Sequence, residues 1–564
     1  MMKTILTLLI VLSLTPGIAQ TIELVEDIVP GLSGSTPTEL TVANGLLFFV
    51  ADDGVNGKEL WVMNDNEEVT LLDLTPGADA TEPAKLIATE THLFFLTTNY
   101  DQNDDFVSHT LWSSDGTLNG TQSLGDFPDE ELEIGITGMS TTSSLLFFIS
   151  SYNGMPGREL WRSDGTPAGT FMIDVNEDPT PSIIFDDFNP AVYEDELYFY
   201  SAALNAILRS DGTQAGTTIV VNNANIDPTA QHVILPHQGN LYFITGSAGL
   251  RKYAIDGSSD DVLISGGETG VTVRKILQVV NDQLYFFGYT SDHGTELWVQ
   301  HLSGAAKSPT QMLRDFHLGN AGSITTYGHI AYKDKLYFGS HNHGTANGMA
   351  VFSLGSELWN TNGTPTGTKL FKDINQGVES GLYYIMEPQL YANHLFFAAD
   401  DGTHGSELWV TDGNPNLVIT IGSDVRGGTY MVQDLRVGVG FSNPTNLTVY
   451  KSILYFAAYD GVHGRELFHY QIPKVYSGKK IASVSPINAF PNPTQGRFTL
   501  NWDEAIAEPG ILTITDYYGN VVQKDVVNFP LSRQIDLGRR YPGMYMIKIV
   551  VGDQQFTQKV MVNR

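Results

Sequence analysis

A glutamate that precedes Leu-Trp, or a close variant of this pair, recurs along the chain and is the first candidate for chemistry. It stands at Glu59, Glu159, Glu296, Glu357, Glu407 and Glu466. A pair of carboxylates can serve as the acid and base of a glycosidase, but an enzyme needs that pair once and not in every repeat. A buried carboxylate also needs hydrogen-bond partners, which turn amides can supply. We therefore interpret these glutamates as structural.

Repeated aspartates raise the possibility of calcium binding, because Ca²⁺ prefers carboxylate and carbonyl oxygens. Apolar segments end at Asp73, Asp174, Asp315 and Asp373, and more loosely at Asp126 and Asp424. The chain contains no Asp-x-Asp-x-Asp-Gly calcium loop, and its Asp-Gly pairs, as at Asp53-Gly54, Asp401-Gly402 and Asp460-Gly461, are typical of turns. We expect no bound cofactor, with a calcium-binding ring of these carboxylates as the alternative.

Three histidines stand immediately before Gly-x-Glu-Leu, at His293, His404 and His463, and His341 and His343 lie nearby. Histidine combined with glutamate can bind zinc. However, other repeats have Asn56 or Pro156 in the same place. We therefore favour loop polarity and predict no metal ligand.

Motifs of common enzymes are absent from the sequence. It contains no phosphate-binding loop, no nucleophile elbow and no zinc-protease motif. We predict no catalytic and no cofactor-binding residue, so an enzymatic role is not favoured, although the fold alone would not exclude one.

The elements that must position these residues are short strands arranged in repeats. An apolar-aromatic triplet begins at Leu47, Leu93, Leu146, Leu197, Leu241, Leu284, Leu336, Leu395 and Leu454. A second signature follows most triplets, and its clearest copy runs from Glu159 to Thr170. Aromatic and β-branched residues favour strands, whereas Asp-Gly-Thr favours a turn that the aspartate closes by accepting a local backbone N–H. The pattern predicts four antiparallel strands in each repeat.

The Glu-Leu-Trp signature resembles the ELWxxDGT repeat family, over residues 21–470 approximately. The resemblance implies a large exported bacterial protein with an all-β fold, a closed β-propeller of four-stranded blades. Six tryptophans share one repeat position and could stack on sugars, but we favour packing between blades because Trp has the area to fill that space. They are Trp61, Trp112, Trp161, Trp298, Trp359 and Trp409.

The two ends of the repeat region predict how the ring closes. The last repeat stops after Glu466-Leu467-Phe468, and residues 24–31 match the middle of a repeat at residues 70–77. N-terminal strands that complete the last blade would remove the exposed sheet edges. We count nine blades, or eight if a degenerate repeat has merged with its neighbour.

The last eighty residues have a different pattern of short alternating strands and Gly/Pro turns, which indicates a small β-sandwich. The pattern resembles the type A sorting domain of the type IX secretion system of Bacteroidota. That resemblance implies recognition by the secretion machinery, export across the outer membrane, and release or attachment at the cell surface. The residues that carry it are Pro491, Asn492, Pro493, Gly496, Gly519, Gly543, Tyr545 and Lys559.

The start of the chain is typical of a signal peptide, with Lys3, an apolar stretch over residues 5–14 and small residues before Gln20. We therefore assign residues 1–19 to a signal peptide, 20–473 to the propeller, 474–484 to a linker and 485–564 to the sorting domain. No later stretch reaches the roughly 20 apolar residues of a membrane-spanning helix.

Charge and cysteine content narrow the partners. The chain has no cysteine and a net charge of −32, and residues 481–564 balance 8 Lys and Arg against 7 Asp and Glu. The acidity is therefore concentrated in the repeats, where it disfavours nucleic acid and favours cations or basic partners. Such acidity also keeps an exported protein soluble.

We favour a secreted or cell-surface protein with a non-enzymatic binding or adhesion role toward a glycan or protein. The binding loops are expected near the insertion at residues 339–355. One alternative is an extracellular glycosidase or lyase, built from irregular acidic stretches at 101–105, 129–133 and 186–187. Another is a structural surface component, which would associate with itself.

Overall fold

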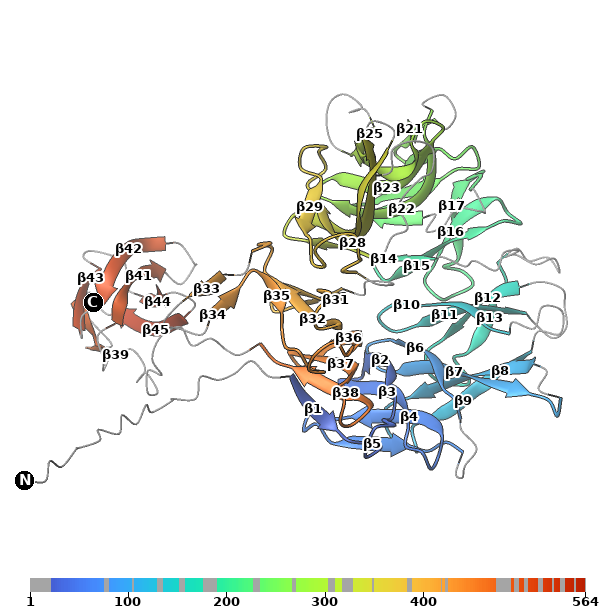
Figure 1. Ribbon diagram of the computed structural model, residues 1–564, viewed down its shortest axis with the longest axis horizontal. Coiled ribbons are helices and arrows are strands. Elements are labelled where there is room, and N and C mark those ends of the chain that lie inside the picture. The colour runs from blue at the N-terminus through green and yellow to red at the C-terminus, as the bar shows by residue number, and fades with distance from the viewer. Residues whose placement is uncertain are drawn as a thin grey trace, which may run out of the picture. The chain divides into compact units, whose positions relative to one another are not determined.

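The computed structural model describes residues 22–472 and 488–562, each range with gaps. The gaps are residues 76–80, 104–105, 129–134, 152–157, 176–189, 227–233, 266–269, 303–309, 317–327, 347–348, 383–387, 417, 421–424, 491–496, 502–505, 516–520, 530–531, 538–542 and 552–553. The described residues contain strands and no helix, and hence no helix able to cross a membrane (Figure 1). They divide into a larger unit, within Met1–Val418 and Gly427–Ile472, and a smaller one, within Ile419–Arg426 and Pro473–Arg564.

The larger unit is built from four-stranded antiparallel sheets, nine of them within the described residues. Eight of these sheets are each formed by strands that follow one another, or nearly so, along the chain. We number the sheets from first to ninth in the order in which they occur in the sequence. The first three sheets contain β2 (Thr38–Ala43), β3 (Leu46–Asp52), β4 (Lys58–Met63) and β5 (Val69–Leu72); β6 (Ala84–Ala88), β7 (Leu93–Tyr100), β8 (Phe106–Ser114) and β9 (Gln122–Pro128); and β10 (Thr137–Thr141), β11 (Leu146–Ser151), β12 (Arg158–Ser163) and β13 (Phe171–Ile173). The next three contain β14 (Ala191–Tyr193), β15 (Glu196–Ser201), β16 (Ala206–Ser210) and β17 (Thr218–Asn222); β18 (Ile234–His237), β19 (Asn240–Ile244), β20 (Leu250–Ala254) and β21 (Asp260–Ile264); and β22 (Thr272–Val280), β23 (Gln283–Thr290), β24 (Gly294–His301) and β25 (Gln311–Arg314).

The seventh and eighth sheets depart from the simple pattern. They contain β26 (His329–Tyr332), β27 (Lys335–Ala346), β28 (Met349–Thr361) and β29 (Lys369–Lys372); and β30 (Gln389–Tyr391), β31 (His394–Asp400), β32 (Ser406–Thr411) and β35 (Thr429–Met431). Along the chain, a separate two-stranded sheet of β33 (Val418–Thr420) and β34 (Val425–Gly427) comes between the third and fourth strands of the eighth sheet. The aspartate after that fourth strand is therefore Asp434. The sequence pattern predicts this aspartate at Asp424, which comes before the fourth strand because of the inserted pair of strands. Asp424 itself lies outside the described residues.

The ninth sheet joins the two ends of the repeat region. It contains β36 (Thr445–Tyr450), β37 (Ile453–Tyr459), β38 (Arg465–Tyr470) and β1 (Ile22–Glu26). β1 pairs antiparallel with β38, with Ile22 opposite Tyr470 and Leu24 opposite Phe468. The prediction that an N-terminal strand completes the last repeat is confirmed at this pairing.

Local sequence explains the turns within the sheets. Between the first two strands, Asn44 and Gly45 both have positive φ, at 48° and 71°, which is the geometry of the two-residue turn that suits twisted strands. Between the third and fourth strands, Asp164 Oδ1 accepts the backbone N–H of Thr166 at 3.0 Å, and Gly165 has a φ of 91°. The predicted Asp-Gly-Thr turn is confirmed there.

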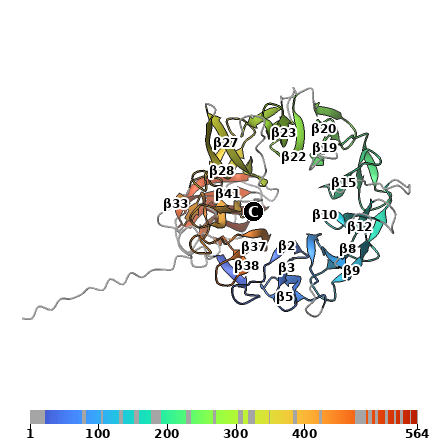
Figure 2. The same cartoon turned by 45° about the vertical axis from the view of Figure 1, so that its right-hand side comes forward.

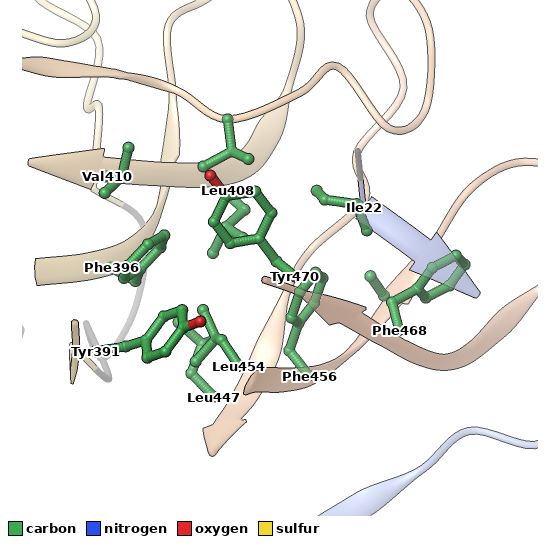
Figure 3. Close-up of a cluster of buried hydrophobic side chains, with 12 residues drawn as sticks. Ile22, Tyr391, Phe396, Leu408, Val410, Leu447, Leu454, Phe456, Phe468 and Tyr470 are labelled. Atoms are coloured by element: carbon green, nitrogen blue, oxygen red, sulfur yellow. The ribbon is translucent and has the colours of Figure 1, made fainter. Parts of the chain in front are cut away.

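The hydrophobic core of the larger unit lies between neighbouring sheets. Figure 3 shows the cluster between the eighth and ninth sheets, where Phe396 and Leu408 pack with Phe456 and Tyr470, beside Ile22 of β1. A similar cluster joins the ninth sheet to the first through Tyr450 and Leu47, among others. Comparable clusters join all the remaining consecutive pairs of sheets. Figure 2 shows the sheets following one another in sequence order around a circle.

Besides most of the β33–β34 pair, the smaller unit contains two further sheets. One is built from β39 (Asn488–Phe490), β40 (Arg497–Asn501) and β43 (Ser532–Asp536), and the other from β42 (Val521–Phe529), β41 (Ile506–Thr515), β44 (Gly543–Val551) and β45 (Gln554–Val562). Both sheets contribute to one buried cluster, which includes Phe498, Leu512 and Tyr545. The shared core explains why the strands alternate between buried and outward positions.

Candidate functional site

Five of the six repeated glutamates are buried, and they hold the linkers that join one sheet to the next. Glu59, Glu296, Glu357, Glu407 and Glu466 are all 0% exposed. Glu59 Oε1 accepts the backbone N–H of Thr81 at 2.7 Å. Glu357 accepts the backbone N–H groups of Ile374 and Gly381 at 2.7 and 2.6 Å. For Glu159 the following linker, residues 176–189, lies outside the described residues.

The same kind of contact connects the last repeat to the start of the repeat region. Glu466 accepts the backbone N–H of Val29 at 3.2 Å and that of Ser35 at 2.8 Å, and it also accepts the Ser35 hydroxyl. These residues lie between β1 and β2, so they link the ninth sheet to the first. A charged acceptor strengthens such hydrogen bonds, and its removal would leave buried N–H groups without partners.

Burial governs the charge of these glutamates. Desolvation raises the pKa of Glu357 to about 7, although the N–H groups of Ile374 and Gly381 oppose the shift. It likewise raises the pKa of Glu407 to about 6, against hydrogen bonds from Ser442 and Leu435. Such perturbed carboxyl groups can mark catalytic sites, but structural networks produce them too. Here the same environment recurs from sheet to sheet, as expected of a structural group.

The loops between the second and third strands lie beside the linkers. The Asp52 N–H donates to the Ser35 carbonyl at 2.9 Å, and the Tyr459 N–H donates to that of Ser442 at 2.8 Å. Gly34 and Gly464 sit where the ninth-sheet loop meets the linker, because a Cβ on Gly464 would lie 2.4 Å from the Gly34 nitrogen. In the first, eighth and ninth sheets these loops and linkers are therefore in contact, and we call the surface formed by residues 27–36, 52–57, 401–405, 434–443 and 460–465 the loop face.

Aspartate and histidine side chains pair within the loop face. His404 Nδ1 lies 2.8 Å from Asp401 Oδ2, and His463 Nδ1 lies 2.6 Å from Asp460 Oδ2. These contacts raise the pKa of both histidines. In the first sheet, the amide of Asn56 donates to Asp53 Oδ2 at 2.8 Å and so replaces histidine in the same role.

Metal-binding arrangements are not assembled by these pairs. His293 Nδ1 lies 2.8 Å from Asp315 Oδ2, a linker aspartate, and not from a second histidine. No group of three or more His, Cys, Asp or Glu side chains placed to hold a metal occurs in the described part of the chain. The side chains of His341 and His343 fall outside the description.

The six repeat tryptophans lie in the third strands of their sheets and pack toward neighbouring sheets. Trp359 is 2% exposed and packs edge-on against Phe316, with ring centroids 5.0 Å apart. Trp61 is more exposed, but it stacks on Phe49 and donates its indole N–H to the Ala51 carbonyl at 3.0 Å. Each of the other four tryptophans lies in, or packs against, a buried cluster shared by two neighbouring sheets. They are Trp112, Trp161, Trp298 and Trp409.

Other predicted positions fall partly outside the described residues. The insertion at 339–355 forms the extended ends of β27 and β28, but the side chains of residues 341–354 are not described. Residues 104–105, 129–133 and 186–187 of the acidic stretches lie outside the described residues as well. The same holds for Pro491, Asn492, Pro493, Gly496 and Gly519, and for the signal peptide, residues 1–19.

Three of the sorting residues lie on described strands of the smaller unit. Gly543 and Tyr545 are in β44, and Lys559 is in the adjacent β45, opposite Met546. Tyr545 is 4% exposed and belongs to the core shared by the two sheets.

The residues that the glutamates hold were missed by the sequence analysis. Three of these residues begin a short pattern of Ser or Thr, any residue and Pro, found at Ser35–Pro37, Thr81–Pro83 and Ser442–Pro444. In each case the hydroxyl residue contacts the glutamate of the preceding repeat. Alignment of the segments before each triplet could have revealed this pattern, because proline and leucine recur there at constant spacing.

Comparison with known families gives one match, in the smaller unit. Residues 488–563 match a family described as a secretion system C-terminal sorting domain. This match implies export by the type IX secretion system to the cell surface or the medium. A search of curated proteins gives no match.

Comparison with solved structures gives matches of low identity and low TM-score. One is PorZ, described as an essential surface component of the type IX secretion system of Porphyromonas gingivalis, with 13% identity, a TM-score of 0.33, and coverage of 94% of this chain and 75% of that one. Another is the computationally designed protein Ika8, with 13% identity, a TM-score of 0.34, and coverage of 69% and 99%. A third is a prolyl endopeptidase, with 10% identity, a TM-score of 0.37, and coverage of 68% and 56%.

Proposed function

We propose that this chain is a non-enzymatic binding or adhesion protein that the type IX secretion system exports, and that its larger unit is a nine-bladed β-propeller. The observation that carries the export proposal is the match of residues 488–563 to a sorting domain. The chain would use residues 1–19 as a signal peptide and residues 485–564 as the signal for the outer-membrane step.

The propeller proposal is supported by the packing of the nine sheets. Each sheet shares a buried cluster with the next, and the ninth shares one with the first through Tyr450, Tyr455 and Leu47. The pairing of β1 with β38 builds the last blade from both ends of the repeat region. A closed ring of this kind leaves only short outer sheet edges, which protects a secreted protein from edge-to-edge association.

A binding role is favoured over catalysis by what the repeated carboxylates do. Glu59, Glu357, Glu407 and Glu466 are each occupied by backbone or hydroxyl donors of a linker. Groups held in this way stabilise a scaffold and are not presented to a substrate. Propellers present their loops as a contact surface, and the proposal includes no cofactor.

Truncation of the sorting domain tests the export proposal. A chain that ends at residue 484 should be made and folded but retained in the periplasm, because it lacks the region recognised at the outer membrane. Its location can be measured by protease accessibility of intact cells and by immunoblots of periplasm and medium. As a control, residues 474–564 fused to a periplasmic reporter should carry that reporter out of the cell. Surface exposure of the truncated chain would contradict the proposal.

A further inference from the structure

A row of exposed apolar side chains crosses the loop face where the ring of sheets closes. We call it the apolar arc: Leu32, Val55, Val437, Val439, Phe441 and Val462. These side chains are 49% to 88% exposed, with Phe441 the least and Val437 the most. They are six of the sixteen large apolar side chains exposed in the described residues. Exposed apolar groups that gather in this way mark interaction sites more often than scattered ones do.

The segments that carry the arc are in direct contact with each other. A Cβ on Gly405 would lie 2.5 Å from the Gly440 carbonyl oxygen, so loop 401–405 packs on linker 434–443. The same linker reaches loop 460–465, because a Cβ on Gly461 would lie 3.4 Å from the Arg436 side chain. That loop in turn contacts linker 27–36, because the Thr36 N–H donates to the Arg465 carbonyl at 2.9 Å.

Loop 52–57 completes the series through the hydrogen bond between the Asp52 N–H and the Ser35 carbonyl. The buried Glu407 and Glu466 anchor the two linkers of the series from below, at Ser442 and Ser35. The apolar arc is therefore presented by a backbone that the fold already holds, so a partner would bind with little loss of loop entropy.

The charge of the same segments favours a basic partner. Residues 27–36, 52–57, 401–405, 434–443 and 460–465 contain six aspartates against two arginines. Burial acts to raise the pKa values of Asp53, Asp401 and Asp460, but turn N–H groups and the neighbouring Asn or His outweigh it and lower them. These aspartates therefore stay ionised beside the apolar side chains at neutral pH.

We propose that the apolar arc is a docking surface for a protein segment in which apolar side chains alternate with lysine or arginine. The inference rests on the proposed binding role and names its surface and partner chemistry. A second copy of the chain fits less well, because each copy carries a net charge of −32. An anionic membrane is disfavoured for the same reason.

The test measures binding of a short fluorescent peptide of leucine and lysine to the full chain by fluorescence anisotropy. A peptide with glutamate in place of lysine, and one with serine in place of leucine, are the reference probes. We expect saturable binding of the Leu-Lys peptide alone, which weakens as salt rises from 0.05 to 0.5 M. The double variant V437S/V439S should weaken it about tenfold, because it removes two apolar contacts.

Two further variants provide the controls. Leu118→Ser removes an apolar group that is 55% exposed from the turn between the third and fourth strands of the second sheet, outside the loop face, and should leave binding unchanged. Asp460→Asn should weaken binding and its salt dependence together. Circular dichroism checks that each variant is folded.

Equal binding of the Leu-Lys and Leu-Glu peptides, or unchanged affinity of V437S/V439S, would overturn the proposal. It would also be overturned if light scattering showed dimers of the full chain that V437S/V439S dissociates, since the occupant would then be a second copy. Binding of anionic lipid vesicles through the arc would exclude it likewise. None of these results bears on export, which is read out by localisation in cells.

Discussion

At the scale of single residues, one buried glutamate in most repeats connects the sheet to the linker that follows it. The interactions of Glu357 are typical: the side chain is 0% exposed and accepts two linker N–H groups. Burial penalises the charged form, while the donors favour it, and burial dominates. The glutamate is therefore a structural clamp whose strength depends on its protonation state.

This clamp predicts a pH-dependent stability of the larger unit. The pKa of Glu357 is raised from 4.5 to about 7 in the folded protein, so the folded state binds the proton more tightly than the unfolded state. Its contribution to the free energy of unfolding is therefore complete below pH 4.5 and is lost as the pH rises through 7, by up to about 3 kcal/mol. The raised pKa values of His404 and His463 act in the same direction above pH 6.5.

Urea unfolding between pH 5 and pH 8 measures the effect. We expect the midpoint to fall as pH rises in the natural chain and to fall less in Glu357→Gln, which keeps an acceptor but does not titrate there. Glu379→Gln, an exposed change in the linker that Glu357 holds, is the control and should follow the natural chain. An identical pH profile for Glu357→Gln would show that the clamp does not titrate in this range.

At the scale of elements, the pairing of β1 with β38 determines where the chain closes. Without β1 the N–H and C=O groups of β38 would form a free sheet edge. Ile22 of β1 is 7% exposed and enters the cluster between the eighth and ninth sheets (Figure 3). The linker that follows β1 is held by Glu466 through Ser35. The strand and its linker therefore both connect the start of the repeat region to its last repeat.

Deletion of Ile22–Glu26 should destabilise the larger unit and promote association. The loss includes the burial of Ile22 and the backbone bonds to β38, so we expect a cost of at least about 3 kcal/mol. Thermal unfolding and light scattering measure the two effects. Glu26→Gln, a change to an exposed side chain of the same strand, should alter neither. A deletion variant that is as stable and as monomeric as the natural chain would show that β1 does not close the ring.

At the scale of the whole molecule, the repeated sheets and the terminal unit have separate cores and different net charges. The larger unit carries the acidity, whereas residues 481–564 are nearly neutral. The clusters of the two units share no residue within the described parts of the chain. This separation fits the proposed division between a tail for export and a repeat unit for binding.

The proposed ring of nine sheets predicts what electron microscopy should show. Electron-microscopic averages of the larger unit viewed along the ring axis should show nine radial densities around a centre. Each density would be one four-stranded sheet, because the sheets pack face to face through apolar clusters. Eight densities would mean that two of the sheets are not independent blades, and an open arc would contradict closure by β1.

The sequence alone determined the elements that local chemistry controls. Aromatic triplets predicted the strands, Asp-Gly-Thr predicted turns such as that at Asp164–Thr166, and residues 24–31 predicted the strand that completes the last repeat. The tail pattern predicted the sorting domain that the family match supports. Each of these depends on residues close together in the chain, or on a repeat that appears many times.

The tertiary structure decided which distant residues meet. The partner of Glu466 is Ser35, 431 positions away, and no local pattern encodes that distance. The fourth strand of the eighth sheet follows an inserted pair of strands, which shifted the expected aspartate from Asp424 to Asp434. The apolar arc likewise joins Leu32 to Val437 and Val462 only because the folded chain places their segments in contact. Long-range packing supplies these neighbours, since hydrophobic periodicity specifies which face of a strand is buried but not which sheet covers it.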